Sequence, residues 1–487
     1  LSPIAAARWP TRGGIYESLM VYNSATKQWT PWLATQYRWS EDALTLTFDI
    51  RAGIRWSDGR PFSSQDVAFT FELLRQYPAL DSGGLWKRLR DVSVVDASVR
   101  LHFVAPFTPA FDAIALTPIV PRHVWAGLAD PVKYADPNPI GTGPFTEITQ
   151  FETSQYQISA NPHYWQPGLP RVKTLRFPAF SDNDQANMAL VNGDVDWAGN
   201  FIPAVDRTFV SVDPKHHDYW FALNGTMVFL YPNHLDPHLR DRDLRLSLSS
   251  AIRRDRLVDI AMFGYTRPSH QSPYSDGFSA WQSRADSELQ LTDDHRSLLK
   301  QVASQRTKPF EILVVSGWSD WVRAAQLIAA DFTSAGLPAV VRTLEFGTWF
   351  NRVQRGDFEF TVGWSSEGAT PYDLMRGLME PSLVKERGAM AVSNWHRFGD
   401  PKAGALLAEF AQAADANHRL TLMHALEHRF WDTLPALPLF PNPSWALFNS
   451  SRYVGFPTAD NPYAGASPNA LPEAALVLLQ LKPVGED

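Results

Sequence analysis

The chain has 487 residues, with 44 lysines and arginines against 51 aspartates and glutamates and no cysteine. This length predicts more than one domain, and 45% hydrophobic with 20% charged residues is typical of a folded soluble protein. The lack of cysteine excludes disulfides, thiolate metal sites and a cysteine nucleophile. A formal charge of −7 without basic clusters argues against a nucleic-acid partner. The composition is unusual in its 18 tryptophans, which outnumber the 14 tyrosines and the 8 methionines.

The first part of the chain predicts a small α+β unit at residues 32–140. Apolar and polar residues alternate over 44–50, which predicts a half-buried strand. Residues 92–103 predict an antiparallel hairpin, and between these strands Ser63 or Ser64 is the expected N-cap of a helix that ends near Arg75.

A Pro-rich connector at 136–144 marks the end of that unit. Short strands and one helix are expected as far as Tyr231, followed by a long amphipathic segment over 240–263 that ends at Gly264. Near the C-terminus, residues 475–481 are expected to form the last strand.

The stretch 309–364 predicts a parallel βαβ arrangement. Its expected elements are a strand at 310–315, a helix at 320–332, and strands at 339–344 and 358–362. Ligands of open α/β sheets bind outside the carboxyl ends of the strands. Trp318 and Trp364 follow two of these strands and are therefore candidate ligand contacts.

Two histidine motifs are candidates for metal ligands or surface residues. His424, Glu427 and His428 match the H-x-x-E-H spacing and open the alternative of a metal-dependent hydrolase, although the motif is weak without a third ligand and a polar cleft. His216 and His217 are adjacent and are expected to be surface or loop residues. Phosphate-loop, dinucleotide-binding and serine-hydrolase motifs are missing from the sequence.

The tryptophans divide into two groups. Those within periodic elements are expected to be core residues: Trp56, Trp125, Trp165 and Trp431. Those at turns or strand ends among polar residues are candidates for stacking against a sugar: Trp9, Trp318, Trp321, Trp364 and Trp395. A peptide site would differ, because it would place acidic and basic groups for the two termini.

An ordered series of motifs resembles the extracytoplasmic solute-binding proteins of the oligopeptide/dipeptide class, family 5. The motifs are Glu17-Ser18-Leu19, Trp56-Ser57-Asp58-Gly59-Arg60-Pro61-Phe62, Gln65-Asp66-Val67-Ala68-Phe69, Gly141-Thr142-Gly143-Pro144-Phe145 and Asn161-Pro162-His163-Tyr164-Trp165. Asp194-Val195-Asp196-Trp197 and Gly317-Trp318-Ser319-Asp320 further resemble the branch that binds chito- and cello-oligosaccharides.

This resemblance implies a two-lobed α/β periplasmic binding protein fold, of type II in its large three-domain form, with the ligand cleft between the lobes. The implied division is a discontinuous core domain of lobe 1 (1–31, 141–238 and 465–487), a small inserted domain (32–140), and lobe 2 (239–464). It also implies a periplasmic, non-catalytic monomer without a cofactor that delivers its ligand to an ABC transporter permease. A signal peptide, which the sequence from Leu1 does not show, is expected to have been removed if it was ever present.

The resemblance also implies a set of ligand contacts. Trp318 would be the stacking ring and Asp320 the carboxylate beside it, with Asn200 and Phe201 from the opposite lobe and Trp364 at the next strand end. Relatives have a second stacking tryptophan where this chain has Ala470. Either Tyr463, Trp395 or Trp9 is expected to replace that ring, or the ligand is expected to be larger, branched or differently oriented. The function expected first is capture of β-linked oligosaccharides; the alternative with the same fold is capture of oligopeptides.

Overall fold

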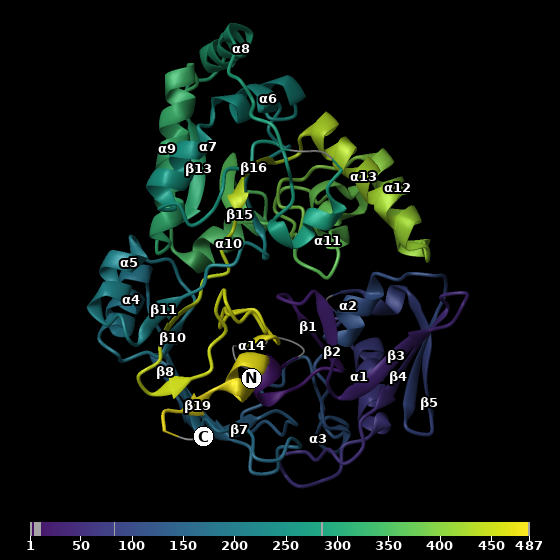
Figure 1. Ribbon diagram of the computed structural model, residues 1–487. Coiled ribbons are helices and arrows are strands. Elements are labelled where there is room, and N and C mark those ends of the chain that lie inside the picture. The colour runs from purple at the N-terminus through teal and green to yellow at the C-terminus, as the bar shows by residue number, and fades with distance from the viewer. Residues whose placement is uncertain (1, 4–10, 82, 284–285, 486–487) are drawn as a thin grey trace.

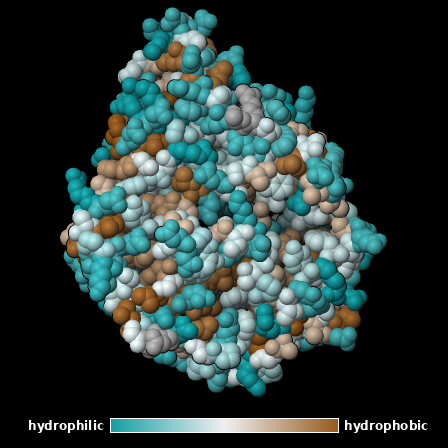
Figure 2. Space-filling view, viewed as in Figure 1, coloured by the Kyte–Doolittle hydropathy of each residue, from teal (hydrophilic) through white to brown (hydrophobic). Residues whose placement is uncertain are grey.

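The computed structural model describes residues 2–3, 11–81, 83–283 and 286–485, and it has two lobes (Figure 1). The first lobe holds both ends of the described chain, the purple and blue elements and the yellow α14 and β19; the second holds most of the teal and green ones. One face of the molecule carries mainly hydrophilic and intermediate residues, with its hydrophobic residues in small separate groups (Figure 2). Among the described residues, no helix combines the length and apolar character that crossing a membrane requires.

The second lobe is built on a five-stranded sheet in the order β14-β13-β15-β12-β16. Its strands are β12 (Met227–Pro232), β13 (Phe310–Val315), β14 (Ala339–Leu344), β15 (Phe360–Trp364) and β16 (Leu437–Pro441). Strand β13 is parallel to β14 and β15, whereas β12 is antiparallel to β15 and β16. The parallel βαβ prediction is confirmed, because the helix between β13 and β14 is α9 (Ser319–Ala335), which ends at Gly336 with φ +107°.

Helices surround this sheet. They are α6 (Arg242–Ala251), α7 (Arg254–Arg256), α8 (Asp293–Ser304), α9, α10 (Phe346–Gln354), α11 (Tyr372–Met379), α12 (Pro401–Gln412) and α13 (Ala416–Thr433). The predicted amphipathic segment 240–263 is interrupted between α6 and α7, where the backbone of Ile252 is extended. A large hydrophobic core fills the space between the sheet and these helices.

The small α+β unit in the first lobe has the predicted elements. Its antiparallel sheet runs in the order β3-β4-β6-β5, formed by β3 (Ala34–Trp39), β4 (Thr45–Ile50), β5 (Leu89–Val95) and β6 (Ser98–Phe103). Its helices are α1 (Ser64–Gln76), α2 (Ala110–Ala115) and α3 (Arg122–Trp125). Ser63 is the N-cap of α1 and forms a capping box with Asp66, which satisfies backbone donors at the helix start.

The rest of the first lobe contains short strands and helices. The sheets are β7-β8-β9 (Phe145–Phe151, Gln155–Ala160, Thr174–Pro178), β10-β17-β11 (Trp197–Ala198, Leu447–Asn449, His217–Tyr219), β1-β2 (Met20–Asn23, Gln28–Pro31) and β18-β19 (Tyr453–Val454, Lys482–Pro483). The helices are α4 (Asn183–Val191), α5 (Val205–Thr208) and α14 (Ala474–Gln480).

Three expectations differ from the structure. Residues 475–481 do not form a strand, because all but the last lie in helix α14, whose alanines and leucines favour a helix and whose only β-branched residue is Val477. Strand β17 pairs with β10 and β11, so the chain has returned to the first lobe well before residue 465. His217 is buried and stacks on Phe209 at 4.1 Å between ring centroids, and is therefore not a surface residue.

Candidate functional site

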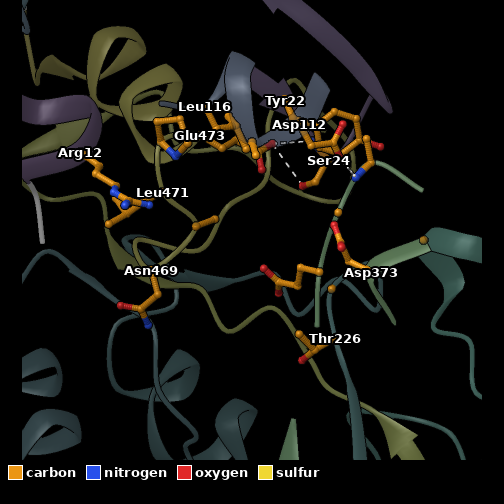
Figure 3. A pocket seen from close by; sticks show the side chains of 18 of the residues that line it. Arg12, Tyr22, Ser24, Asp112, Leu116, Thr226, Asp373, Asn469, Leu471 and Glu473 are labelled. Carbon is orange, nitrogen blue, oxygen red and sulfur yellow. Dashed lines mark hydrogen bonds between the residues drawn. The ribbon is translucent and has the colours of Figure 1, made fainter. Parts of the chain in front are cut away.

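A cavity of about 710 Å³ lies between the two lobes. From the second lobe, its wall is formed by the loops that follow β15 and β16 and the loop that precedes β12. These three loops meet at one edge of the sheet because β12 is antiparallel to both of its neighbours. The first lobe contributes residues of β1, β2 and α2 and the segment 469–473 (Figure 3).

The lobes touch directly around this cavity. The backbone N–H of Ala369, in the loop after β15, donates to Oδ2 of Asp112 in α2 at 2.8 Å. Nδ2 of Asn224 also donates to the carbonyl of Ser24 at 3.3 Å, and Ser24 lies beside Asp112 in Figure 3. Both contacts join the two lobes next to the cavity.

Five carboxyl groups line the cavity: Asp81, Asp112, Glu367, Asp373 and Glu473. The Asp81 carboxylate accepts hydrogen bonds from the backbone N–H groups of Leu85 and Trp86 at 2.8 and 2.9 Å, and the other four form two pairs. The first pair is formed by Asp112 and Asp373, whose Oδ2 atoms both lie 3.4 Å from the position that a Cβ atom on Gly368 would occupy. Burial raises the pKa of Asp373 to about 6. The charge of Arg376 lowers this pKa, and the charge of Asp112 raises it. Burial also raises the pKa of Asp112, although the hydrogen bond from the N–H of Ala369 and the charge of Arg419 both lower it. Carboxylates in this setting are stabilised by a cation.

The second pair is formed by Glu367, in the loop after β15, and Glu473, just before α14. Burial and the charge of Glu473 raise the pKa of Glu367. Glu473 is held in place because its Oε1 atom accepts hydrogen bonds from the backbone N–H groups of Ser24 and Gly465 at 2.8 and 2.6 Å.

A positive group lies at the other end of the cavity. Arg12, in the turn Thr11–Ile15, sits beside Leu471 and Asn469, far from Asp373 in the same view (Figure 3). Burial lowers the pKa of Arg12. In the described part of the chain no carboxylate forms an ion pair with Arg12, so its guanidinium is available to an anionic group in the cavity.

Aromatic residues complete the wall. Tyr22 and Trp29 pack against each other with ring centroids 5.3 Å apart, and Trp445 lies on the opposite lobe. Trp445 is supported from behind by Phe201 and Phe221 at 5.6 and 4.8 Å. The cavity therefore combines apolar faces with charged groups at both ends.

The predicted tryptophans lie together, but not on this wall. Trp318, Trp364 and Trp395 form a cluster with two others in the second lobe: Trp318 lies 4.9 Å from Trp321, and Trp364 lies 5.2 Å from Trp395 and 5.6 Å from Trp349. Trp318 is half-buried, whereas Trp321, Trp349 and Trp395 are buried in the core. Trp9 lies outside the described residues.

The other predicted contacts also lie off the wall. Asp320 is buried in the first turn of α9, where burial raises its pKa to about 7. The Nδ2 atom of Asn200 donates to Asn187 at 2.8 Å, and Phe201 packs behind Trp445. Tyr463 donates its hydroxyl to the carbonyl of Gly455 at 2.6 Å. Ala470 does line the cavity.

The carboxyl pairs and Arg12 were missed by sequence reasoning. The rule that ligands bind beyond the carboxyl ends of strands points to the edge of the sheet that lines this cavity. It was applied to the residues directly at the strand ends, Trp318 and Trp364, whereas Glu367 lies three positions further along its loop. The available signal was Glu367 in the loop after β15, with Asp373 at the start of the following helix.

The metal alternative gains no support. Glu427 is fully buried, and its Oε2 atom accepts hydrogen bonds from the backbone N–H and hydroxyl of Ser283 at 2.7 and 2.6 Å. His428 packs against Trp431 on the same helix. Within residues 2–3, 11–81, 83–283 and 286–485, no group of three or more histidine, aspartate or glutamate side chains is arranged to hold a metal ion.

Replacing Trp318 by alanine is expected to lower the free energy of unfolding by about 2–3 kcal/mol, because it removes packing against Trp321 and Trp364. Ligand affinity should change by less than about threefold, since the ring does not line the cavity. Urea unfolding and ligand titration measure the two effects. Trp445→Ala is the comparison, because Trp445 lines the cavity and its loss should weaken binding. If Trp318→Ala keeps its stability but binds the ligand much more weakly, Trp318 contacts the ligand.

Two lobes with a ligand-sized cavity between them define the class of periplasmic binding proteins. Residues 28–382 match the family described as "Bacterial extracellular solute-binding proteins, family 5 Middle", and the chain belongs to this family. It is thus the solute-binding component of an ABC transporter, and its class binds and delivers ligands without transforming them.

Several known proteins are similar to this chain. The glutathione-binding protein GsiB of Escherichia coli (strain K12) is 23% identical over 422 residues, which cover 84% of this chain and 79% of GsiB. A mannohexaose-bound periplasmic oligopeptide-binding protein of Thermotoga maritima has a TM-score of 0.88 and 21% identity, covering 97% of this chain and 94% of its own. The periplasmic binding protein DppA of Helicobacter pylori, in complex with the peptide STSA, has a TM-score of 0.84 and 17% identity, covering 99% and 95%.

Proposed function

We propose that this protein captures short peptides in the periplasm and delivers them to the permease of its ABC transporter. The observation that carries the proposal is the distribution of charge in the cavity, with carboxyl groups along one part of the wall and Arg12 at the other end. A peptide is a zwitterion, so its ammonium group matches Asp112 and Asp373 while its carboxylate matches Arg12. This is the alternative expectation of the sequence rather than the first.

The first expectation, β-linked oligosaccharides, rested on stacking rings that lie away from the cavity. Trp318, Trp364 and Trp395 pack within the second lobe. One observation still favours a glycan as the second candidate, namely that Trp29 and Trp445 line the cavity from opposite lobes and could contact sugar faces. The Thermotoga maritima structure, bound to mannohexaose, agrees with this candidate.

Ligand binding to Asp112 and Asp373 would also favour the closed arrangement of the lobes. Asp112 belongs to the first lobe and Asp373 to the second, and an ammonium group between them would relieve their mutual repulsion. A ligand that binds one state better shifts the population toward that state. Closure linked to binding would let the permease distinguish the loaded protein from the empty one.

Thermal shift and calorimetric titration with a panel of di-, tri- and tetrapeptides and of cello-, chito- and manno-oligosaccharides test the proposal. Peptides are expected to raise the melting temperature in a concentration-dependent way, because a ligand of the native state stabilises it by mass action. Binding of glycans with no response to any peptide would overturn the peptide proposal and favour the second candidate.

Asp373→Asn is expected to weaken peptide binding by about tenfold or more, because a charged partner of the ammonium group is lost inside the cavity. The matched control is Asp460→Asn, which makes the same change at an exposed residue away from the cavity. Both variants should be titrated with the tightest peptide of the panel. Equal affinities for the two variants would show that Asp373 does not contact the ligand.

A further inference from the structure

The second carboxyl pair, Glu367 and Glu473, is left without a partner once a peptide ammonium group has been assigned to Asp112 and Asp373. Both residues line the cavity, Glu367 from the second lobe and Glu473 from the first. Both carboxyl groups face the same cavity, and the charge of Glu473 adds to burial in raising the pKa of Glu367. A peptide with only one ammonium group would therefore leave a like-charge pair unneutralised inside the closed cavity.

Glu367 has no counter-charge from the protein. Its side chain is exposed and opens into the cavity, so a ligand that fills the cavity would remove it from bulk water. Across the described ranges, no hydrogen bond or ion pair is formed by its carboxylate, and the two cations of the cavity wall, Arg12 and Lys27, pair with neither glutamate. An ionised carboxyl group that is removed from bulk water without a cation is unfavourable.

Glu473 differs from Glu367 in that neutral donors hold it in place. The backbone N–H and hydroxyl of Ser24 and the N–H of Gly465 donate to its Oε1 atom. These bonds fix the position of the carboxyl group without neutralising it. The first pair is in a different environment, because Arg376 acts on Asp373 and Arg419 acts on Asp112. The pair formed by Glu367 and Glu473 is thus where the cavity lacks positive charge.

We propose that the preferred ligands are basic peptides, in which the cation of a lysine or arginine side chain lies between Glu367 and Glu473. This inference rests on the proposed peptide function and adds the charge of the side chain that the cavity selects. The side-chain cation contacts one carboxylate from each lobe, so it also contributes to closure. Peptides with an acidic side chain at this position are rejected, because they would add a third negative charge.

Matched peptides isolate the side-chain charge. Three tripeptides, Lys-Ala-Ala, Ala-Lys-Ala and Ala-Ala-Lys, are compared with the same peptides carrying Nε-acetyl-lysine, which keeps the length of the side chain but removes its charge. The wild-type protein is expected to bind at least one lysine peptide about tenfold or more tightly than its acetylated counterpart by calorimetry.

The variant Glu367→Gln is expected to reduce this preference to less than about threefold, because it removes one of the two charges that contact the cation. Glu367 is chosen rather than Glu473, which also anchors Ser24 and Gly465. Glu147→Gln, on the exposed face of β7 and outside the cavity, is the matched control and should keep the full preference. Melting temperatures of both variants verify that they fold.

The possible results separate the two proposals. If no peptide binds, the peptide function itself fails. If lysine and acetyl-lysine peptides bind the wild type equally, peptide binding stands but the selection of basic peptides is wrong. If Glu367→Gln keeps the full preference, the cation lies elsewhere and the role assigned to Glu367 and Glu473 is wrong.

Discussion

Replacing Glu17 by alanine is expected to lower the free energy of unfolding by about 3–5 kcal/mol. Glu17 is fully buried, and its Oε1 atom accepts hydrogen bonds from Nε1 of Trp32 at 2.7 Å and the hydroxyl of Tyr164 at 3.1 Å. Its Oε2 atom accepts from Nε1 of Trp165 at 3.1 Å. Alanine would leave these three donors without their acceptor and would open a cavity beside them. Urea unfolding at pH 6 measures the loss, and a loss below about 1 kcal/mol would contradict this account.

The same residue is expected to make stability depend on pH. Burial outweighs the hydrogen bonds from Trp32, Trp165 and Tyr164 and raises the pKa of Glu17 to about 7. Between about pH 4.5 and pH 7 the folded protein therefore holds this proton more tightly than the unfolded chain does. Stability should fall as the pH rises through this interval, by up to about 3 kcal/mol from Glu17 alone.

The variant Glu17→Gln isolates this contribution, because Asp320 and Asp373 also have raised pKa values and titrate in the same interval. Glutamine keeps one acceptor oxygen but cannot ionise. The measurement is the free energy of unfolding at pH 5.5, 6.5, 7.5 and 8.5 for both proteins. The wild type should lose more stability with rising pH than Glu17→Gln does; parallel curves would show that Glu17 does not titrate there.

The sequence patterns predicted elements well where one periodicity dominates. The strand-helix-strand segment β13-α9-β14 and the helix capped by Ser63 follow from alternation, apolar runs and capping residues that lie close together in the chain. The strand predicted over 475–481 is wrong, because a short apolar run fits a buried strand and a buried helix equally well. Only its packing in the first lobe, where Val477 and Leu478 are buried, decides between them.

The site was harder to predict, because its wall is assembled from segments far apart in the sequence. Asp112 and Asp373 lie in different lobes and converge only when these meet. The strand-end tryptophans lie off the cavity wall for a related reason. Trp364, the last residue of β15, and Trp318, just after β13, lie against the hydrophobic layer beside the sheet, where Trp349 of α10 packs on both of them. Residues further along the loops reach the cavity.

Gly141→Ala is expected to destabilise the protein by more than about 4 kcal/mol or to prevent folding, because its backbone neighbours cannot move independently. A Cβ atom at this position would lie 1.9 Å from the carbonyl oxygen of Ile15. That carbonyl already accepts the N–H of Gly143 at 2.9 Å, and the carbonyl of Gly141 accepts the N–H of Ser57 at 2.9 Å. The segment 141–143 thus forms backbone hydrogen bonds both to Ile15 and to Ser57 of the small α+β unit.

The matched control is Gly127→Ala, whose Cβ atom would come no closer than 3.8 Å to its nearest neighbour and should change stability by less than about 1 kcal/mol. Soluble yield, circular dichroism and urea unfolding compare the two variants. If Gly141→Ala folds with the stability of Gly127→Ala, the contact with Ile15 can relax freely. The Gly-Thr-Gly-Pro motif would then need another explanation than the close approach of these two backbone segments.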